Sequence, residues 1–355
     1  MCPVGFLDLR SYVWHVANIF GSIAKWRYEM NKLIMLLAVF LSLGLVITSG
    51  CVDNQEVSAS SDKPVVAVSI LPQAEFVEKI AGDQVRVLVM VPQGADPHTY
   101  EITSGQLRDL SKAQMYVKVG SGLDFENVWM DRLIAQNSGM LIVDSSSGIK
   151  LLTMVAHSHD DEDYDEEHDQ EENDRDEHES EDHADEQNHT QAAGAKDPHI
   201  WTSPQEAKIM VNNTYAGLVQ IDPDNKDLYM QNRDAYLAEL DAADAMIRET
   251  LAGKEGSSFI VYHPSWGYFA DEYGLVEVSV EIEGKEPSAK DMQRLIDTAK
   301  EKNISVIFVQ PGFSATSAKA IASEINAEVV AIDPLAKDYI DNLAKVSEAF
   351  AKGLA

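Results

Sequence analysis

Short apolar runs alternate with amphipathic segments from Val65 onward, and this alternation limits the possible folds more than any other feature of the chain. The runs VVAVSIL (65–71) and VRVLVMV (85–91) are apolar and β-branched, as expected of strands buried on both faces. Between them, residues 73–81 place Phe76, Val77 and Ile80 at helical spacing. The alternation predicts an α/β fold with mainly parallel sheets and helices on both faces.

The expected elements form two βα series that are separated by a pair of helices. The expected strands are residues 65–71, 85–91, 115–119 and 141–143, followed by 258–262, 276–282, 306–309 and 328–332. The expected helices are residues 73–81, 104–110, 125–135, 204–220, 225–251, 266–273, 288–302, 317–325 and 339–352. Before residue 204, Ser203-Pro204-Gln205-Glu206 has the pattern of a capping box with proline at the first helical position.

The segment 225–251 is predicted to be one long helix, with an apolar face formed by Tyr229, Tyr236, Leu240, Ala243, Ile247 and Leu251. At about 1.5 Å per residue, such a helix is roughly 40 Å long, which suits a rigid connection between two lobes. We therefore expect an N-terminal lobe at 64–222, a linking helix at 223–252 and a C-terminal lobe at 253–355.

A segment at 157–189 interrupts the first series and cannot join a core. It contains eighteen acidic residues, one arginine and six histidines: His157, His159, His168, His178, His183 and His189. Because it has no aliphatic residue larger than alanine, it cannot bury enough apolar surface to offset the entropy lost on ordering. This acidic histidine tract is either a solvated linker or a weak, accessory metal-binding loop, since imidazoles and carboxylates both bind divalent metals.

The N-terminal 50 residues have the pattern of a secretory signal. An apolar run at 33–47 follows Lys25, Arg27 and Lys32, and it is shorter than the ~20 residues of a spanning helix. Small residues and Cys51 come next, as in a lipobox, so Cys51 is the expected lipidation site and 51–63 the tether. An uncleaved membrane anchor is the alternative. Met30 would make an ordinary start, so residues 1–29 are either an over-extended gene start or an unusually long n-region.

The charge of the chain excludes some partners. The formal net charge is −31, and such a field repels nucleic acid and attracts cations. The two cysteines, Cys2 and Cys51, do not provide a disulfide framework.

We expect an extracytoplasmic, membrane-anchored monomer with no nucleic-acid partner.

Outside the tract and the signal region, the chain has three histidines, and each lies beside a proline. His98 follows the expected strand 85–91, His199 precedes the helix at 204, and His263 follows strand 258–262 directly. Asp333 follows strand 328–332 in the same way. Open parallel sheets place ligands at the carboxyl ends of their strands.

These four side chains predict a metal site. Three imidazoles and a carboxylate suit Zn²⁺, whereas a set with more oxygens would favour Mn²⁺. For each residue alone there is a simpler interpretation. Each histidine could be a hydrogen-bonding loop residue, and Asp333 could cap the following turn.

Four motifs resemble, in order, those of the solute-binding proteins of zinc and manganese ABC importers, the cluster 9 or cluster A-I family. They are Asp96-Pro97-His98, Asp197-Pro198-His199-Ile200-Trp201, Tyr262-His263 with Tyr268 and Phe269, and Ile332-Asp333-Pro334-Leu335. The match covers about residues 64–355, and an acidic, histidine-rich insertion is typical of the zinc branch.

The resemblance implies two lobes with the metal in the cleft between them. It implies that His98, His199 and His263 bind the metal and that Asp333, or water in its place, completes the site. Manganese members have Glu at the position of His263, so zinc is the expected cargo. The implied partners are an ABC permease and its ATPase. Gln310 stands where many relatives have Glu, and we do not expect it to bind metal.

Three other functions stay open at this stage. A manganese-binding member of the same family is one, and an adhesin or extracellular metal buffer is another. A zinc hydrolase is the third, but the sequence has no H-E-x-x-H, G-x-S-x-G or Walker A motif, and nothing places Glu281 or Glu283 near zinc as a general base. We therefore expect no catalytic residues.

Overall fold

The computed structural model describes residues 63–154, 196–281, 286–311 and 316–354. The signal region, Cys51, the tether to residue 62, the acidic histidine tract and Glu283 lie outside the described residues. Residues Asp62–Ala355 form one compact unit. Among the described residues, no helix is both long and apolar enough to cross a membrane.

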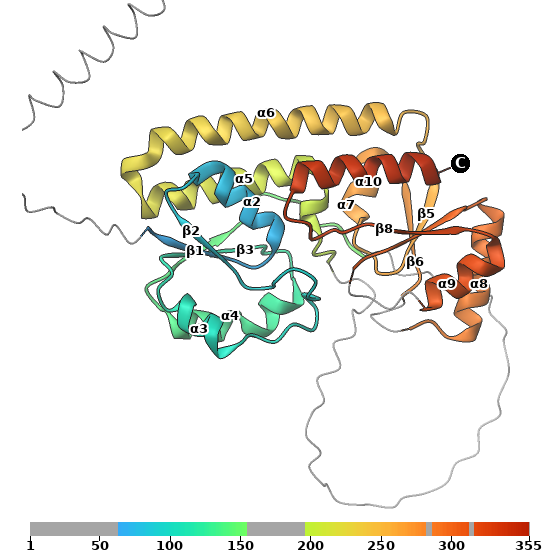
Figure 1. Cartoon of the computed structure of the whole chain (residues 1–355), viewed down its shortest axis with the longest axis horizontal. Helices are drawn as coiled ribbons and strands as arrows, with labels where there is room; N and C mark the ends of the chain where they lie inside the picture. The colour runs from blue at the N-terminus through green and yellow to red at the C-terminus, as the bar shows by residue number, and fades with distance from the viewer. Residues whose placement is uncertain (1–62, 155–195, 282–285, 312–315, 355) are drawn as a thin grey trace, which may run out of the picture. The chain divides into compact units, whose positions relative to one another are not determined.

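The first lobe is built on a four-stranded parallel sheet in the order β2-β1-β3-β4 (Figure 1). Its strands are β1 (Val65–Val68), β2 (Arg86–Val89), β3 (Met115–Lys118) and β4 (Leu141–Asp144). The helices that follow β1, β2 and β3 are α2 (Leu71–Ala81), α3 (Ser104–Leu110) and α4 (Asp124–Gln136). Each helix therefore connects parallel strands, as the alternating pattern predicts.

The second lobe repeats this arrangement, with a parallel sheet in the order β6-β5-β7-β8. Its strands are β5 (Ser258–Val261), β6 (Val276–Ser279), β7 (Val306–Val309) and β8 (Glu328–Ala331). Its helices are α7 (Gly267–Tyr273), α8 (Ala289–Glu301), α9 (Thr316–Ile325) and α10 (Tyr339–Gly353). The predicted fold class, two lobes of mainly parallel sheet flanked by helices, is confirmed.

Among the residues that the structure describes between the two sheets in sequence are two α-helices and two short 3₁₀ helices. They are η1 (Ile200–Thr202), α5 (Pro204–Ile221), η2 (Pro223–Asn225) and α6 (Lys226–Thr250). The Ser203 hydroxyl caps α5 by accepting from the backbone N–H groups of Gln205 and Glu206. Only this serine half of the expected capping box is formed, because the Ser203 N–H donates to the Ile200 carbonyl at 3.4 Å and not to Glu206. Glu206 Oε2 is buried and makes no hydrogen bond among the described residues.

The long helix α6 runs along both lobes (Figure 1) and packs against α2 and α5 of the first and α10 of the second. Its expected apolar face is buried in full: Tyr229, Tyr236, Leu240, Ala243, Ile247 and, just past its end, Leu251. One hydrophobic cluster continues through both sheets and includes Val66 of β1 and Phe259 of β5. The lobes therefore share a core, and packing rather than a bare linker joins them.

Six of the eight expected strands end earlier than expected, at the carboxyl ends that lead to the site. The run 65–71 was expected to be all strand, but β1 ends at Val68 because Leu71 and Pro72 already begin α2. The expected strand 276–282 ends at Ser279. These shorter strands leave loop backbone at the carboxyl edges of the sheets, where side chains can converge.

Candidate metal centre

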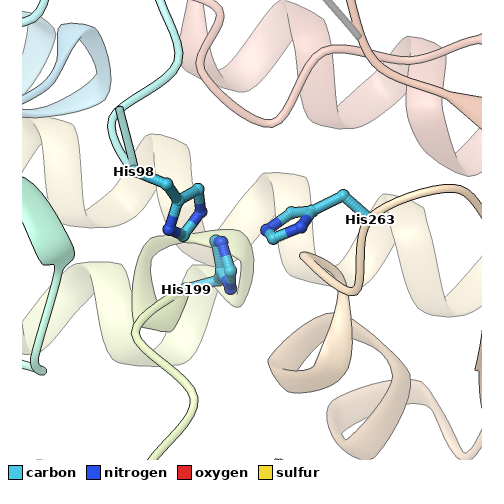
Figure 2. Close-up of side chains that lie close together, drawn as sticks. All are labelled: His98, His199 and His263. Atoms are coloured by element: carbon cyan, nitrogen blue, oxygen red, sulfur yellow. The ribbon is translucent and has the colours of Figure 1, made fainter. Parts of the chain in front are cut away.

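His98, His199 and His263 meet at one point, although they lie far apart in the sequence (Figure 2). One nitrogen of each ring can act as a ligand, and these three atoms all lie within 4.8 Å of one another. Ring centroids are 4.6 Å apart for His98 and His263, 5.3 Å for His199 and His263, and 5.8 Å for His98 and His199. His199 and His263 are buried, and His98 is partly buried.

The segments Asp96-Pro97-His98 and Asp197-Pro198-His199 fold in the same way. In each, the aspartate Oδ1 accepts the backbone N–H of the histidine two residues later, at 2.9 Å. This bond makes a tight turn that mimics a backbone turn, and the proline fixes φ inside it. The turn holds the histidine backbone in a loop, and for His199 the helix η1 adds support, because the His199 carbonyl accepts the Thr202 N–H at 3.1 Å.

Asp333-Pro334-Leu335 forms the same turn, with Asp333 Oδ1 accepting the Leu335 N–H at 2.8 Å. By position within the turn, Asp333 corresponds to Asp96 and Asp197, and Leu335 corresponds to the histidines. Within the described part of the chain, the group of closely spaced ligand atoms contains the three histidines and does not include Asp333. The observed hydrogen bond agrees with the simpler interpretation, in which Asp333 caps the following turn. The role of Asp333 as a fourth metal ligand stays a prediction.

Each histidine of the group has a carboxylate on its Nδ1 atom. The distances are 2.8 Å from His98 to Asp124 Oδ2, 2.8 Å from His199 to Asp197 Oδ1 and 2.9 Å from His263 to Glu281 Oε2. A carboxylate accepts the Nδ1–H proton, which leaves the Nε2 lone pair of that tautomer to bind a metal. Such partners also fix the ring orientation.

The carboxylates come from three separate elements. Asp124 is the first residue of α4, and the next residue, Phe125, donates its N–H to the Pro97 carbonyl in the His98 loop at 3.0 Å. Asp197 belongs to the same turn as His199. Glu281 lies two residues beyond β6, which pairs in parallel with β5, and its N–H bonds to the Tyr262 carbonyl at 2.9 Å.

The electrostatic environments of His98 and His263 differ. Burial lowers the pKa of His98, but the hydrogen bond to Asp124 and the charges of Asp96, Asp124 and Glu281 outweigh it, so the net pKa is raised. Burial lowers the pKa of His263 to about 4, against the raising effect of its bond to Glu281. His263 is therefore neutral at neutral pH, as a metal ligand must be.

The donor set fits zinc. Three neutral imidazoles are a common set for a four-coordinate Zn²⁺, with a carboxylate or water in the fourth position. Ligand atoms on a tetrahedron with bonds of ~2.1 Å are ~3.4 Å apart, so the three nitrogens are within a short inward shift of such a geometry.

Sequence reasoning did not identify the carboxylates as partners of the ligands. On sequence grounds Glu281 is a possible general base with no evident place near zinc, whereas in the structure its carboxylate is hydrogen-bonded to His263. A usable signal for Glu281 is its position beyond a strand, as for His263. Asp124 has no comparable local signal. Gln310 lies near the His263 loop, with its Oε1 3.5 Å from the Ser265 hydroxyl.

This fold and this cluster define a two-lobed α/β protein with a candidate metal centre formed from both lobes. The family model described as ZnuA, zinc-uptake complex component A, periplasmic, matches residues 66–353. The match covers well over half of the chain, and the chain therefore belongs to this family.

Individual relatives support the assignment. The high-affinity zinc uptake system protein ZnuA of Bacillus subtilis (strain 168) is 32% identical over 319 residues, which cover 88% of this chain and 89% of the relative. A crystal structure of ZnuA has a TM-score of 0.69 and 40% identity, and it covers 82% of this chain and 99% of its own. A 138–173 deletion mutant of ZnuA with zinc bound has the same TM-score and identity, with coverages of 82% and 98%.

Proposed function

We propose that this chain captures Zn²⁺ outside the cytoplasm and delivers it to an ABC permease driven by its ATPase. The observation that carries the proposal is the meeting of His98, His199 and His263, each with a carboxylate on Nδ1. Membership of a family described as a periplasmic zinc-uptake component supports the same role and a binding rather than a catalytic function.

In this proposal the Nε2 atoms of the three histidines bind the metal, and Asp333 or a water completes the coordination. The carboxyl group of Asp333 is half-buried, and burial raises its pKa. Oδ1 of Asp333 accepts the Leu335 N–H, and Oδ2 is the oxygen that we propose as the metal ligand. Three nitrogen ligands favour zinc over manganese, which prefers oxygen donors.

The acidic histidine tract has an accessory role in this proposal. Its six histidines, His157, His159, His168, His178, His183 and His189, collect Zn²⁺ weakly and raise its concentration near the cleft. The ZnuA deletion mutant with zinc bound shows that a relative can lose a 138–173 segment and still hold zinc.

We also propose that Cys51 carries a lipid that anchors the chain to the outer face of the cytoplasmic membrane, and that the chain acts as a monomer. Zinc-binding lipoprotein AdcA of Streptococcus pneumoniae, 27% identical over 310 residues, supports the anchor; the match covers 86% of this chain and 56% of that relative. Mass spectrometry of the membrane-bound protein would show a lipidated N-terminal cysteine.

Uptake of ⁶⁵Zn by cells that lack their own copy of this protein tests the proposed function. Expression of the native chain is expected to restore uptake in zinc-poor medium, whereas the triple variant His98→Ala, His199→Ala, His263→Ala is not. A variant with exposed Lys319 changed to Ala is the control. Restoration by the triple variant, at matched protein level, would contradict the proposal.

A further inference from the structure

The carboxylate of Asp197 is in contact with both lobes. Its Oδ1 atom bonds to the backbone N–H and to Nδ1 of His199, at 2.9 Å and 2.8 Å. Its Oδ2 atom faces Gly267, the first residue of α7 in the second lobe. Asp197 itself is 5% exposed, so its carboxylate is largely shielded from bulk solvent.

Gly267 is a glycine because of this close approach. A Cβ atom added to Gly267 would lie 2.4 Å from Asp197 Oδ2, closer than non-bonded atoms approach. Its backbone does not have a positive φ, so conformation alone does not require glycine there. Any larger residue would have to push the Asp197 carboxylate, and this carboxylate holds the His199 ring.

Glu277 of β6 approaches the same point. Its Oε2 atom lies 3.6 Å from the position that a Cβ of Gly267 would occupy, and its Oε1 atom accepts the Trp266 N–H at 2.9 Å. Burial and the nearby charge of Asp197 raise the pKa of Glu277 to about 8. A carboxyl group that is mostly protonated at neutral pH can donate a hydrogen bond. We infer that its acceptor is the Asp197 carboxylate, because both carboxyl groups approach Gly267 and the charge of Asp197 acts on Glu277.

Tyr268 fixes the backbone of the same segment. Its hydroxyl donates to the Asp197 carbonyl at 3.2 Å and accepts the Leu152 N–H at 2.9 Å. Residues 267, 268 and 277 of the second lobe thus surround Asp197 on its backbone and on its side chain.

We propose that Gly267 and Glu277 are positioning residues for His199, holding the Asp197 carboxylate from the opposite lobe so that His199 keeps its metal-binding orientation only while the two lobes are in contact. Neither residue touches the metal. The proposal deepens the proposed function. If a permease separates the lobes, Asp197 loses its support, His199 loses its fixed tautomer, and the site weakens.

Variants at both positions test the proposal in protein lacking residues 157–189. Gly267→Ala moves Asp197, and Glu277→Leu removes the donor while filling its space. Filling matters because a cavity of about 600 Å³ adjoins Asp197 and Glu277 and could admit a water. Glu277→Gln keeps a neutral donor and is the rescue variant. Gly139→Ala, with no atom closer than 4.0 Å, and Glu328→Ala, on the opposite edge strand β8, are controls.

Two readouts are needed. Imidazole ¹⁵N chemical shifts of the metal-free protein report the His199 tautomer, and competition with a fluorescent chelator gives zinc affinity. We expect Gly267→Ala and Glu277→Leu to turn a single Nδ1–H tautomer into a mixture. Zinc affinity should fall about tenfold or more for Gly267→Ala and about threefold to tenfold for Glu277→Leu. These losses are at or below the lower end of the range seen when a hydrogen-bond partner of a metal ligand is removed. Glu277→Gln and both controls should match the native protein.

Native His199 shifts and native affinity in both test variants would overturn the proposal. Loss of affinity in Glu277→Gln as large as in Glu277→Leu would also overturn it, because the hydrogen-bond donor would then be irrelevant. If the native protein failed to bind zinc, the proposed function would fail, and the ¹⁵N shifts of the metal-free protein would still decide the role of Gly267 and Glu277.

Discussion

At the scale of single residues, each histidine of the cluster has its two ring nitrogens assigned to different tasks. Nδ1 bonds to Asp124, Asp197 or Glu281, and Nε2 is left for the metal. For His98 and His199, a neighbouring Asp-Pro pair sets the backbone. The ring of His98 takes its partner, Asp124, from outside this turn, whereas the ring of His199 bonds to Asp197 within it. If the three histidines bind the metal as proposed, we expect its affinity to depend on these carboxylates as well as on the histidines.

His263 is the ligand that most directly tests the choice of metal. In protein lacking residues 157–189, His263→Ala should weaken zinc binding by more than about 100-fold. Loss of a residue that only hydrogen-bonds to a metal ligand already lowers metal affinity by about 10–100-fold, and loss of the ligand itself should lower it further. Isothermal titration calorimetry measures this, with Lys319→Ala as the surface control. Unchanged tight binding would remove His263 from the site.

His98 should set the acid sensitivity of zinc binding. Its pKa is raised above 6.5, so as the pH falls this ring is protonated before His263, whose pKa is about 4. A proton on His98 competes with zinc, and affinity should fall as the pH drops through the raised pKa of His98.

Asp124→Asn checks this assignment. The change removes a charge that raises the pKa of His98, so the loss of affinity should begin at a lower pH, while affinity at pH 8 falls about tenfold. Zinc affinity measured from pH 5 to pH 8 gives both quantities, and Asp109→Asn on α3 is the control. A pH profile identical to that of the native protein would show that His98 does not control it.

At the scale of elements, three helices meet at the carboxylate of Glu75 in α2. Glu75 accepts the Tyr236 hydroxyl of α6 at 2.8 Å and the Tyr339 N–H of α10 at 2.6 Å. Tyr339 in turn donates its hydroxyl to the Trp201 carbonyl at 2.6 Å, and Trp201 Nε1 donates to the Pro334 carbonyl at 2.7 Å. This chain of bonds ties both lobes to the segment that carries His199.

Glu75→Ala should destabilise the protein by about 1–3 kcal/mol, because it leaves the buried N–H of Tyr339 without its acceptor. The nearby Glu78→Ala, which removes only an exposed ion pair with Lys337, should cost less than about 1 kcal/mol. Chemical denaturation of the metal-free proteins measures both. Equal losses in the two variants would mean that the Glu75 junction has no special role.

At the scale of the whole molecule, much of the fold could be predicted from hydropathy patterns. Helix α3 and strand β7 match the expected residues, and α6 buries the expected face. The three histidines could be predicted because the folded part has no others. The strand order that the two sheets share could not be predicted from the sequence, because this order depends on which strands pair in space.

The partners of the histidines were beyond sequence reasoning for a related reason. Asp124 lies 26 residues after His98, and Glu281 lies 18 residues after His263. Their contacts arise only when α4 meets the His98 loop and when β6 pairs with β5. The Asp197 support from Gly267 and Glu277 likewise depends on how the lobes pack.

The acidic histidine tract and the cleft should bind zinc in different ways. Removal of residues 157–189 should leave one tight site and abolish weaker binding, because a fixed geometry requires the folded lobes. Metal content and titration stoichiometry, with and without the tract, measure this. Loss of the tight site on deletion would make the tract itself the receptor.

The most direct measurement is zinc anomalous diffraction from crystals of the protein without residues 157–189. We expect one strong peak, about 2.0–2.1 Å from the Nε2 atoms of His98, His199 and His263, with Asp333 or water as the fourth ligand. A peak elsewhere, or zinc bound through Nδ1 with the carboxylates displaced, would contradict it.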